Sequence, residues 1–206
     1  MHAYFKGKNM SKTTQRIQNT AAILLILSTL ATTGCVAVLA GSAASSVAVA
    51  HDRRTAGTII DDNNAEIKVT AMVHDNNIIS TNSRIVPVSY NGVMLLVGQT
   101  PTEEMKAEAE RLAKSLPNMS RVYNEIEVRD PVSLPVRNND TWITTKVKSS
   151  LLVNTKLDTT RVKVVTENGR VYLMGLVNAK EEAGAVETAR KVSGVKKVIK
   201  IFEYVQ

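Results

Sequence analysis

Two stretches of the chain share one pattern of apolar and polar positions. Each stretch has a mostly apolar run, an Asn-Gly pair and a second apolar run that ends in glycine, and the two pairs are Asn91-Gly92 and Asn168-Gly169. Asn-Gly between β-rich runs is a strong hairpin signal, because both turn positions require a positive φ. The pattern predicts paired strands at residues 85–89 and 93–97, and again at residues 162–166 and 170–174.

A helix is expected after each hairpin. Thr100 is followed three residues later by Glu103, and Asn178 by Glu181, which is the spacing of a capping box at a helix N-terminus. Apolar residues then recur at helical spacing in both copies. A last strand is expected after each of these helices, at about residues 122–128 and 198–205.

The two stretches are copies of one domain. Asn91 corresponds to Asn168 at an offset of 77 residues, and Ala109 corresponds to Ala185 at an offset of 76. Each copy predicts helix, strand, strand, helix, strand (αββαβ), which is an α+β fold with a small three-stranded mixed sheet packed against two helices. A copy of about 70 residues is near the lower size limit for a stable core, so we expect the two copies to pack against each other.

Residues 1–34 predict a signal peptide. The leader carries four basic residues and no acidic one, and the apolar stretch at 21–31 is about half the roughly 20 residues that span a bilayer. The stretch ends at Gly34-Cys35, which resembles the lipobox of bacterial lipoproteins, although Thr32 and Thr33 depart from its usual residues. Removal of the signal would leave Cys35 to be acylated, and several acyl chains would hold the protein stably on a membrane.

Two alternatives to acylation of Cys35 stay open. The chain could be a secreted protein with one free thiol, or residues 21–50 could be an uncleaved anchor. Translation could also begin at Met10 instead of Met1. Residues 35–56 are rich in Ala, Gly and Ser and predict a flexible tether.

The remaining chain divides into two domains and a linker. We expect the first domain at residues 57–130 and the second at residues 140–206. The linker at residues 131–139 contains Pro131 and Pro135, which favour a short, stiff connection.

The two copies resemble the BON domain, an αββαβ module of periplasmic and outer-membrane proteins. The most specific elements are the hairpins and their ends, Leu96-Val97-Gly98 and Leu173-Met174-Gly175. With Gly34-Cys35, residues 139–147 and 166–169 resemble the DolP/YraP family of dual-BON-domain outer-membrane lipoproteins. This resemblance implies an envelope-integrity protein, lipid-anchored on the periplasmic face of the outer membrane, that binds anionic, phosphatidylglycerol-like phospholipid through its second domain and gathers at the division site. Val36 after the cysteine resembles the signal that sorts enterobacterial lipoproteins to the outer membrane.

The copies differ in charge. Residues 57–130 hold seven basic and eleven acidic residues, a net charge of −4, whereas residues 131–206 hold thirteen and seven, a net charge of +6. A basic surface attracts anionic lipid by about 1 kcal/mol per nearby Lys or Arg. The lysines of the second copy that could contribute are Lys146, Lys148, Lys156, Lys163, Lys191, Lys196, Lys197 and Lys200.

The first helix of the second copy carries the only tryptophan. Ile143, Val147 and Leu151 are spaced as a core stripe, which turns Trp142 about 100° away from the core. An offset of 76 makes Glu66 its equivalent, so the position is expected to be exposed. An exposed tryptophan beside lysines favours a membrane interface, and packing against the first domain or the linker is the alternative. The predicted lipid-contacting residues are Thr141, Trp142, Thr145, Lys146, Lys148, Ser149 and Leu152.

Other functions have little support. His2, His51 and His74 are dispersed, so we expect no metal site, and there is no catalytic constellation, phosphate-binding loop or cofactor motif. Nucleic-acid binding would suit a basic domain, but not an exported one. The alternative function is a protein-interaction module that docks an envelope enzyme or its activator.

Overall fold

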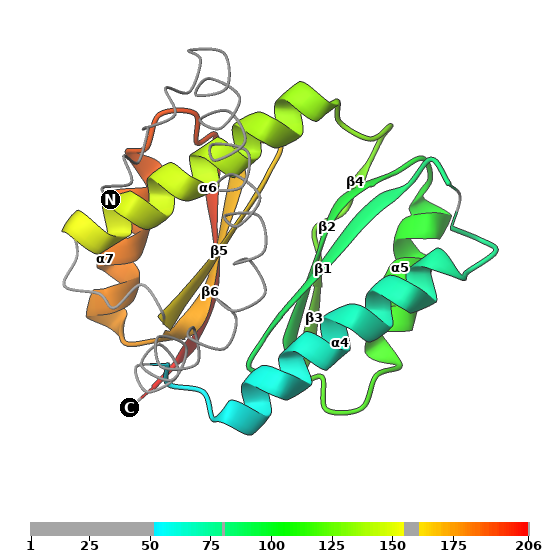
Figure 1. Ribbon diagram of the computed structural model, residues 1–206, viewed down its shortest axis with the longest axis horizontal. Coiled ribbons are helices and arrows are strands. Elements are labelled where there is room, and N and C mark those ends of the chain that lie inside the picture. The colour runs from blue at the N-terminus through cyan, green and yellow to red at the C-terminus, as the bar shows by residue number, and fades with distance from the viewer. Residues whose placement is uncertain (1–51, 80, 155–160, 206) are drawn as a thin grey trace, which may run out of the picture. The chain divides into compact units, whose positions relative to one another are not determined.

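The computed structural model describes residues 52–79, 81–154 and 161–205. In these ranges two αββαβ units follow each other along the chain (Figure 1). The predicted signal peptide, Cys35 and most of the predicted tether lie outside the described residues. Within the described ranges, every helix is too short or too polar to cross a bilayer.

The first unit has a mixed sheet with its last strand in two pieces. Its elements are α4 (Ala56–His74), β1 (Arg84–Tyr90), β2 (Val93–Thr100), α5 (Glu103–Lys114), β3 (Arg121–Asn124) and β4 (Glu127–Val128). β1 pairs antiparallel with β2, and both β3 and β4 pair parallel with it. We predicted one continuous strand here, but the chain breaks between β3 and β4, where Ile126 is buried in the core. The sheet therefore has four strands instead of three.

The second unit has the expected three-stranded sheet. Its elements are α6 (Leu134–Asn154), β5 (Val162–Glu167), β6 (Arg170–Val177), α7 (Ala179–Arg190) and β7 (Lys197–Tyr204). β5 is antiparallel and β7 parallel to the central strand β6. α6 begins at Leu134, so residues 134–139 of the predicted linker are helical. Pro135 fits there because N–H groups in the first turn have no partner within the helix.

The hairpin turns have the predicted geometry. Asn91 and Gly92 have φ values of 54° and 73°, and Asn168 and Gly169 have values of 51° and 76°. Positive φ at both turn positions is the type I′ geometry that Asn-Gly favours.

The glycine that ends each apolar run has a separate role. A Cβ atom on Gly98 would lie 1.9 Å from the carbonyl oxygen of Arg84, and one on Gly175 would lie 2.4 Å from that of Arg161. The neighbouring strand comes too close for a side chain at either position, so these glycines serve backbone packing.

The two predicted helix caps had different outcomes. Asn178 caps α7, and its side chain and that of Glu181 form the predicted capping box. The prediction for Thr100 was wrong, because Thr102 caps α5 and accepts from the backbone N–H of Met105. The hydroxyl of Thr100 instead donates to the carbonyl of Thr102.

Each sheet is covered by its two helices on one face (Figure 1). On the other face the two sheets pack against each other through an apolar cluster. Alternate residues of the central strands divide between these layers, so that Met94 contacts helices while Leu95 contacts the other sheet, and Leu173 and Tyr172 do the same in the second unit. The expected packing of the two domains is therefore confirmed, and it explains why 93–97 is apolar throughout.

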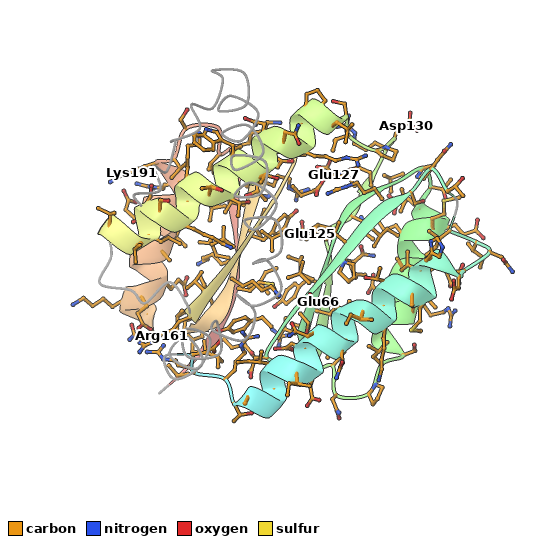
Figure 2. The ribbon with its side chains drawn as sticks, in the orientation of Figure 1. Glu66, Glu125, Glu127, Asp130, Arg161 and Lys191 are labelled. Carbon is orange, nitrogen blue, oxygen red and sulfur yellow. The ribbon has the colours of Figure 1, made fainter. Side chains whose placement is uncertain are left out.

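Charged side chains join the two domains around this apolar cluster. Glu167, which is 4% exposed, accepts from Arg84 at 2.7 Å and from Gln99 at 2.7 Å. Three glutamates of the first domain, which Figure 2 labels, form ion pairs with basic residues of the second domain. The pairs are Lys163 with Glu66 at 2.6 Å, and Arg170 with Glu125 at 2.7 Å and with Glu127 at 3.2 Å. Some acidic residues of the first domain and some basic residues of the second therefore neutralise each other at the domain interface.

Candidate functional site

The rotation of α6 is fixed by one buried carboxylate and one apolar stripe. Asp140 is 4% exposed and accepts from the backbone N–H groups of Asn168 at 2.7 Å and Gly169 at 2.8 Å. The predicted core stripe of Ile143, Val147 and Leu151 is buried, as expected. These contacts tie α6 to the β5–β6 hairpin and determine which residues face water.

The same contact in the first domain corrects the alignment of the two copies. Asp62 accepts from the N–H groups of Asn91 at 2.7 Å and Gly92 at 2.9 Å, so it corresponds to Asp140 at an offset of 78 residues. The equivalent of Trp142 is therefore Asn64, and our assignment of Glu66 was wrong by two residues. The spacing from the aspartate to the core stripe, Asp62 to Ala65 and Asp140 to Ile143, is the sequence signal that would have given the right offset.

Glu66 itself faces the sheet and the second domain. Its carboxylate accepts from the backbone N–H of Ser89 at 2.7 Å, besides the ion pair with Lys163. Asn64 is exposed, so the position of Trp142 is at the surface in both copies.

Trp142 is 61% exposed and belongs to none of the buried apolar clusters of the described residues. Its ring lies at a shallow groove between α6 and α7. Lys191, which follows the last residue of α7 and is labelled in Figure 2, also lines this groove. The other polar residues that line the groove are Thr145, Lys146, Ser149, Ser150, Glu187, Thr188 and Ser193.

The predicted lipid-contacting residues lie on one side of α6, which we call the α6 outer face. Six of the seven are exposed: Thr141, Trp142, Thr145, Lys148, Ser149 and Leu152. Lys146 is half-buried, because its ammonium group donates to the backbone carbonyl of Ser193 at 2.5 Å. We include Val153, which the sequence-based prediction missed, because it is 80% exposed on the same side.

The α6 outer face combines exposed apolar side chains with positive charge. On a helix of 3.6 residues per turn, Trp142, Ser149 and Val153 fall within about 20° of one line, and Lys146 lies about 40° to one side of that line and Lys148 about 120° to the other. The hydroxyl groups of Thr141 and Thr145 donate to backbone carbonyls one turn earlier, at 3.1 Å each. The face therefore presents exposed carbon between two cations, with two of its hydroxyl donors already bonded.

The lysines of the second domain differ in how free their charges are. Lys163 is paired across the domain interface, Lys191 pairs with Glu187 at 2.8 Å, and Lys200 pairs with Glu182 at 2.6 Å. The hydrogen bond from Lys200 lowers the pKa of Glu182, with a second contribution from Tyr204. Lys196 donates to the side chain of Asn168, and Lys156 lies outside the described residues.

Three lysines of the second domain have no partner of this kind. Lys148, Lys180 and Lys197 form neither an ion pair nor a side-chain hydrogen bond with any residue in the ranges that the structure describes. Lys148 is the one that lies on the α6 outer face. Lys146 lies closer to Trp142 around the helix, but its ammonium group is bound to Ser193.

The first domain carries a different surface at the same place. The outer side of α4 exposes Ile60 by 59% and Ile67 by 67%, but it has Asn64 and Thr70 where α6 has Trp142 and Lys148. Across residues 52–79, 81–154 and 161–205, no group of three His, Cys, Asp or Glu side chains could hold a metal ion.

Comparisons with known proteins agree with this architecture. The BON domain model matches residues 61–130 and 139–206. The chain is 42% identical over 181 residues to outer membrane lipoprotein DolP of Haemophilus influenzae, covering 88% of this chain and 94% of that protein. It is 41% identical over 155 residues to the 21 kDa hemolysin of Actinobacillus pleuropneumoniae, covering 75% of this chain and 80% of that protein.

A solved structure is also similar. The C-terminal domain of CdsD, the structural protein of the type III secretion system of Chlamydia trachomatis, matches with a TM-score of 0.30 and 11% identity, over 68% of this chain and 96% of that one. Family membership rests on the sequence matches. The two matched domains and the identity to DolP over most of both chains show that the chain belongs to the BON-domain family, as a member with two BON domains.

Proposed function

We propose that this chain is a non-enzymatic lipoprotein of the outer membrane whose second BON domain binds anionic phospholipid through the α6 outer face. The observation that carries the proposal is the exposure of Trp142, at 61%, between Lys146 and Lys148. An indole ring is favoured at the level of lipid headgroups, and lysines beside it are attracted to anionic headgroups. The ligand class is a phosphatidylglycerol-like surface, and the cellular role is envelope integrity, at the division site.

The membrane anchor in this proposal is Cys35, on the periplasmic face of the outer membrane. It is supported by the Gly34-Cys35 motif and by similarity to a lipoprotein of the outer membrane. Replacing Cys35 by serine should abolish incorporation of labelled palmitate and leave the signal unprocessed. Unchanged labelling of Cys35→Ser would contradict the anchor.

Vesicle binding tests the α6 outer face directly. The chain from residue 36 onward should bind phosphatidylcholine vesicles only when they contain phosphatidylglycerol, and its emission should shift to the blue, because Trp142 is the only tryptophan. Trp142→Asn, which installs the residue of the first domain, should remove most of the binding. Ile67→Asn is the matched control, because Ile67 is equally exposed on α4 and should not contribute.

The vesicle-binding result also distinguishes lipid binding from the alternative function, a protein-interaction module. If Trp142→Asn leaves vesicle binding unchanged, the lipid proposal is wrong and the exposed indole is available to a protein partner. An equal loss in Ile67→Asn would instead mean that both domains contact lipid through their first helices.

A further inference from the structure

The last residues of the predicted tether are bound to the folded domains. Arg53 belongs to a segment that we predicted to be flexible, yet its guanidinium donates to both carboxylate oxygens of Glu181, at 2.7 Å and 3.0 Å. It also donates to the backbone carbonyl of Leu176 at 2.7 Å. Glu181 opens α7 and Leu176 lies in β6, so Arg53 is attached to the second domain.

The next residue is attached to the first domain. Arg54 donates to Asp62 at 2.9 Å, and Asp62 is the buried carboxylate that caps the β1–β2 hairpin. Its guanidinium lies 3.9 Å above the ring of Tyr90 and is also held by Asp52 at 2.8 Å. Stacking on an aromatic ring and bidentate carboxylate binding are the interactions that fix arginine most firmly.

The tyrosine under Arg54 reaches the second domain. Burial raises the pKa of Tyr90 to about 12, so its hydroxyl stays protonated and donates to the carbonyl of Arg161 at 3.1 Å. Of two consecutive arginines, Arg53 thus binds the second domain and Arg54 binds the first.

We propose that Asp52–Arg54 forms a clasp that holds the two BON domains together and fixes the point at which the tether leaves them. Neither domain needs these residues for its own sheet, because the sheets and their helices are complete from Ala56 onward. What the clasp adds is a second stretch of chain that contacts both domains, besides residues 129–133 between β4 and α6. The two domains are then joined on both sides of their apolar interface.

The clasp also sets the position of the tether relative to the α6 outer face. Arg53 is bound at the first turn of α7, whereas the groove beside Trp142 is lined by Gly184, by Glu187 and Thr188 near the end of α7 and by the residues after it. The 12 residues of α7 span about 18 Å at 1.5 Å per residue. The tether therefore begins at the end of α7 that is far from Trp142.

A buried thiol can report whether the clasp holds the domains together. Val97 is 0% exposed at the interface of the two sheets, and Val69 is 0% exposed between α4 and the first sheet. Val97→Cys should be labelled by a thiol reagent only when the domains separate, and Val69→Cys only when the first domain unfolds. Both are prepared in the full chain purified in detergent, with labelling scored by peptide mass spectrometry so that Cys35 does not interfere.

We expect Arg53→Ala to raise the labelling rate at position 97 about tenfold, because a charge-assisted hydrogen bond of this kind shifts an equilibrium by at least one order of magnitude. The rate at position 69 should not change. Arg129→Ala is the matched control, since Arg129 is exposed between β4 and α6 and its side chain forms no hydrogen bond or ion pair with the described residues. In a double-mutant cycle, adding Glu181→Gln to Arg53→Ala should have less effect than Glu181→Gln alone.

Two results would overturn the clasp. One is an unchanged rate at position 97 in Arg53→Ala. The other is an equal rise at positions 69 and 97, which would mean that the arginine stabilises the first domain and not its contact with the second.

Discussion

The two BON domains have the same framework but use their first helices differently. In both, an aspartate on the helix caps the Asn-Gly hairpin, an apolar stripe faces the sheet, and a glycine ends the central apolar run. The outer side of α4 has Asn64 and Thr70, whereas that of α6 has Trp142 and Lys148. Buried positions that carry the fold are alike in the two copies, while exposed positions on the same helix differ.

The caps themselves also differ between the domains. Asp62 accepts from the hydroxyl of Ser89 and from Arg54, besides the two hairpin N–H groups, whereas among the described residues Asp140 accepts from the two hairpin N–H groups alone. The first domain is thus tied to the clasp through its cap. In the ranges that the structure describes, the cap of the second domain has no contact with Arg53 or Arg54.

The largest expected effect is on stability and concerns Gly98 and Gly175, which occupy the same position in the two domains. Gly98→Ala should destabilise the protein by about 3 kcal/mol or more, because Gly98 has a φ of 119° and a Cβ would lie 1.9 Å from a carbonyl oxygen. Gly175→Ala should cost less, since its contact is 2.4 Å and its backbone is not in the left-handed region. Urea unfolding followed by circular dichroism measures both, and the reverse order would mean that β5 cannot move away while β1 can.

The second comparison uses the capping aspartates. Asp62→Ala leaves two half-buried N–H groups, the hydroxyl of Ser89 and the guanidinium of Arg54 without their acceptor and should cost about 3 kcal/mol. Asp140→Ala leaves only the two N–H groups and should cost about 2 kcal/mol. Equal losses of unfolding free energy would show that Ser89 and Arg54 add nothing to the first cap.

The third comparison moves the tryptophan between the domains. In a Trp142→Asn background, Asn64→Trp should restore little vesicle binding, because the first domain has a net charge of −4 and α4 lacks a lysine at the position of Lys148. We expect about tenfold weaker binding than the native chain, in line with the 1.5–3 kcal/mol gained by burying a large apolar side chain. Cosedimentation with anionic vesicles gives the affinities, and full recovery would show that the position of the indole alone determines binding.

The smallest effect concerns a single charge. Lys148→Ala should weaken binding to anionic vesicles about fivefold, which corresponds to about 1 kcal/mol per lysine near the surface. The difference should disappear at about 1 M salt, where the Debye length falls to about 3 Å. Lys197→Ala is the matched control, because Lys197 is also unpaired among the described residues but lies on β7. A loss that persists at high salt would mean that Lys148 acts by packing.

Local patterns predicted most of the fold. The Asn-Gly turns, the alternation in the strands and the stripe of Ile143, Val147 and Leu151 each depend on neighbours within a few residues, and these predictions were confirmed. The break at Ile126 was missed because a buried apolar residue is compatible with a continuous strand. What covers the second face of residues 93–97 could not be predicted either, since a run that is apolar throughout does not indicate its partner.

The candidate site was only partly accessible from the sequence. Exposure of Trp142 followed from the core stripe, but the alignment with Glu66 failed because the copies differ by two residues between the first and second helices. The pairing of Lys163 with Glu66, and of Lys191 with Glu187, could not be read from net charge. The attachment of Arg53 depends on a residue 128 positions away, for which the sequence has no local signal.

The interface between the two sheets is incomplete while the protein is being synthesised. Residues 1–130 are synthesised before any strand of the second domain exists. Until β6 is made, the first sheet exposes to water the face that carries Val88, Tyr90, Val93, Leu95 and Val97. A nascent chain that stalled at the linker would carry this apolar surface uncovered and would be prone to aggregate. The second domain therefore covers an apolar surface of the first domain, and this surface stays uncovered until the second domain has been made and has folded.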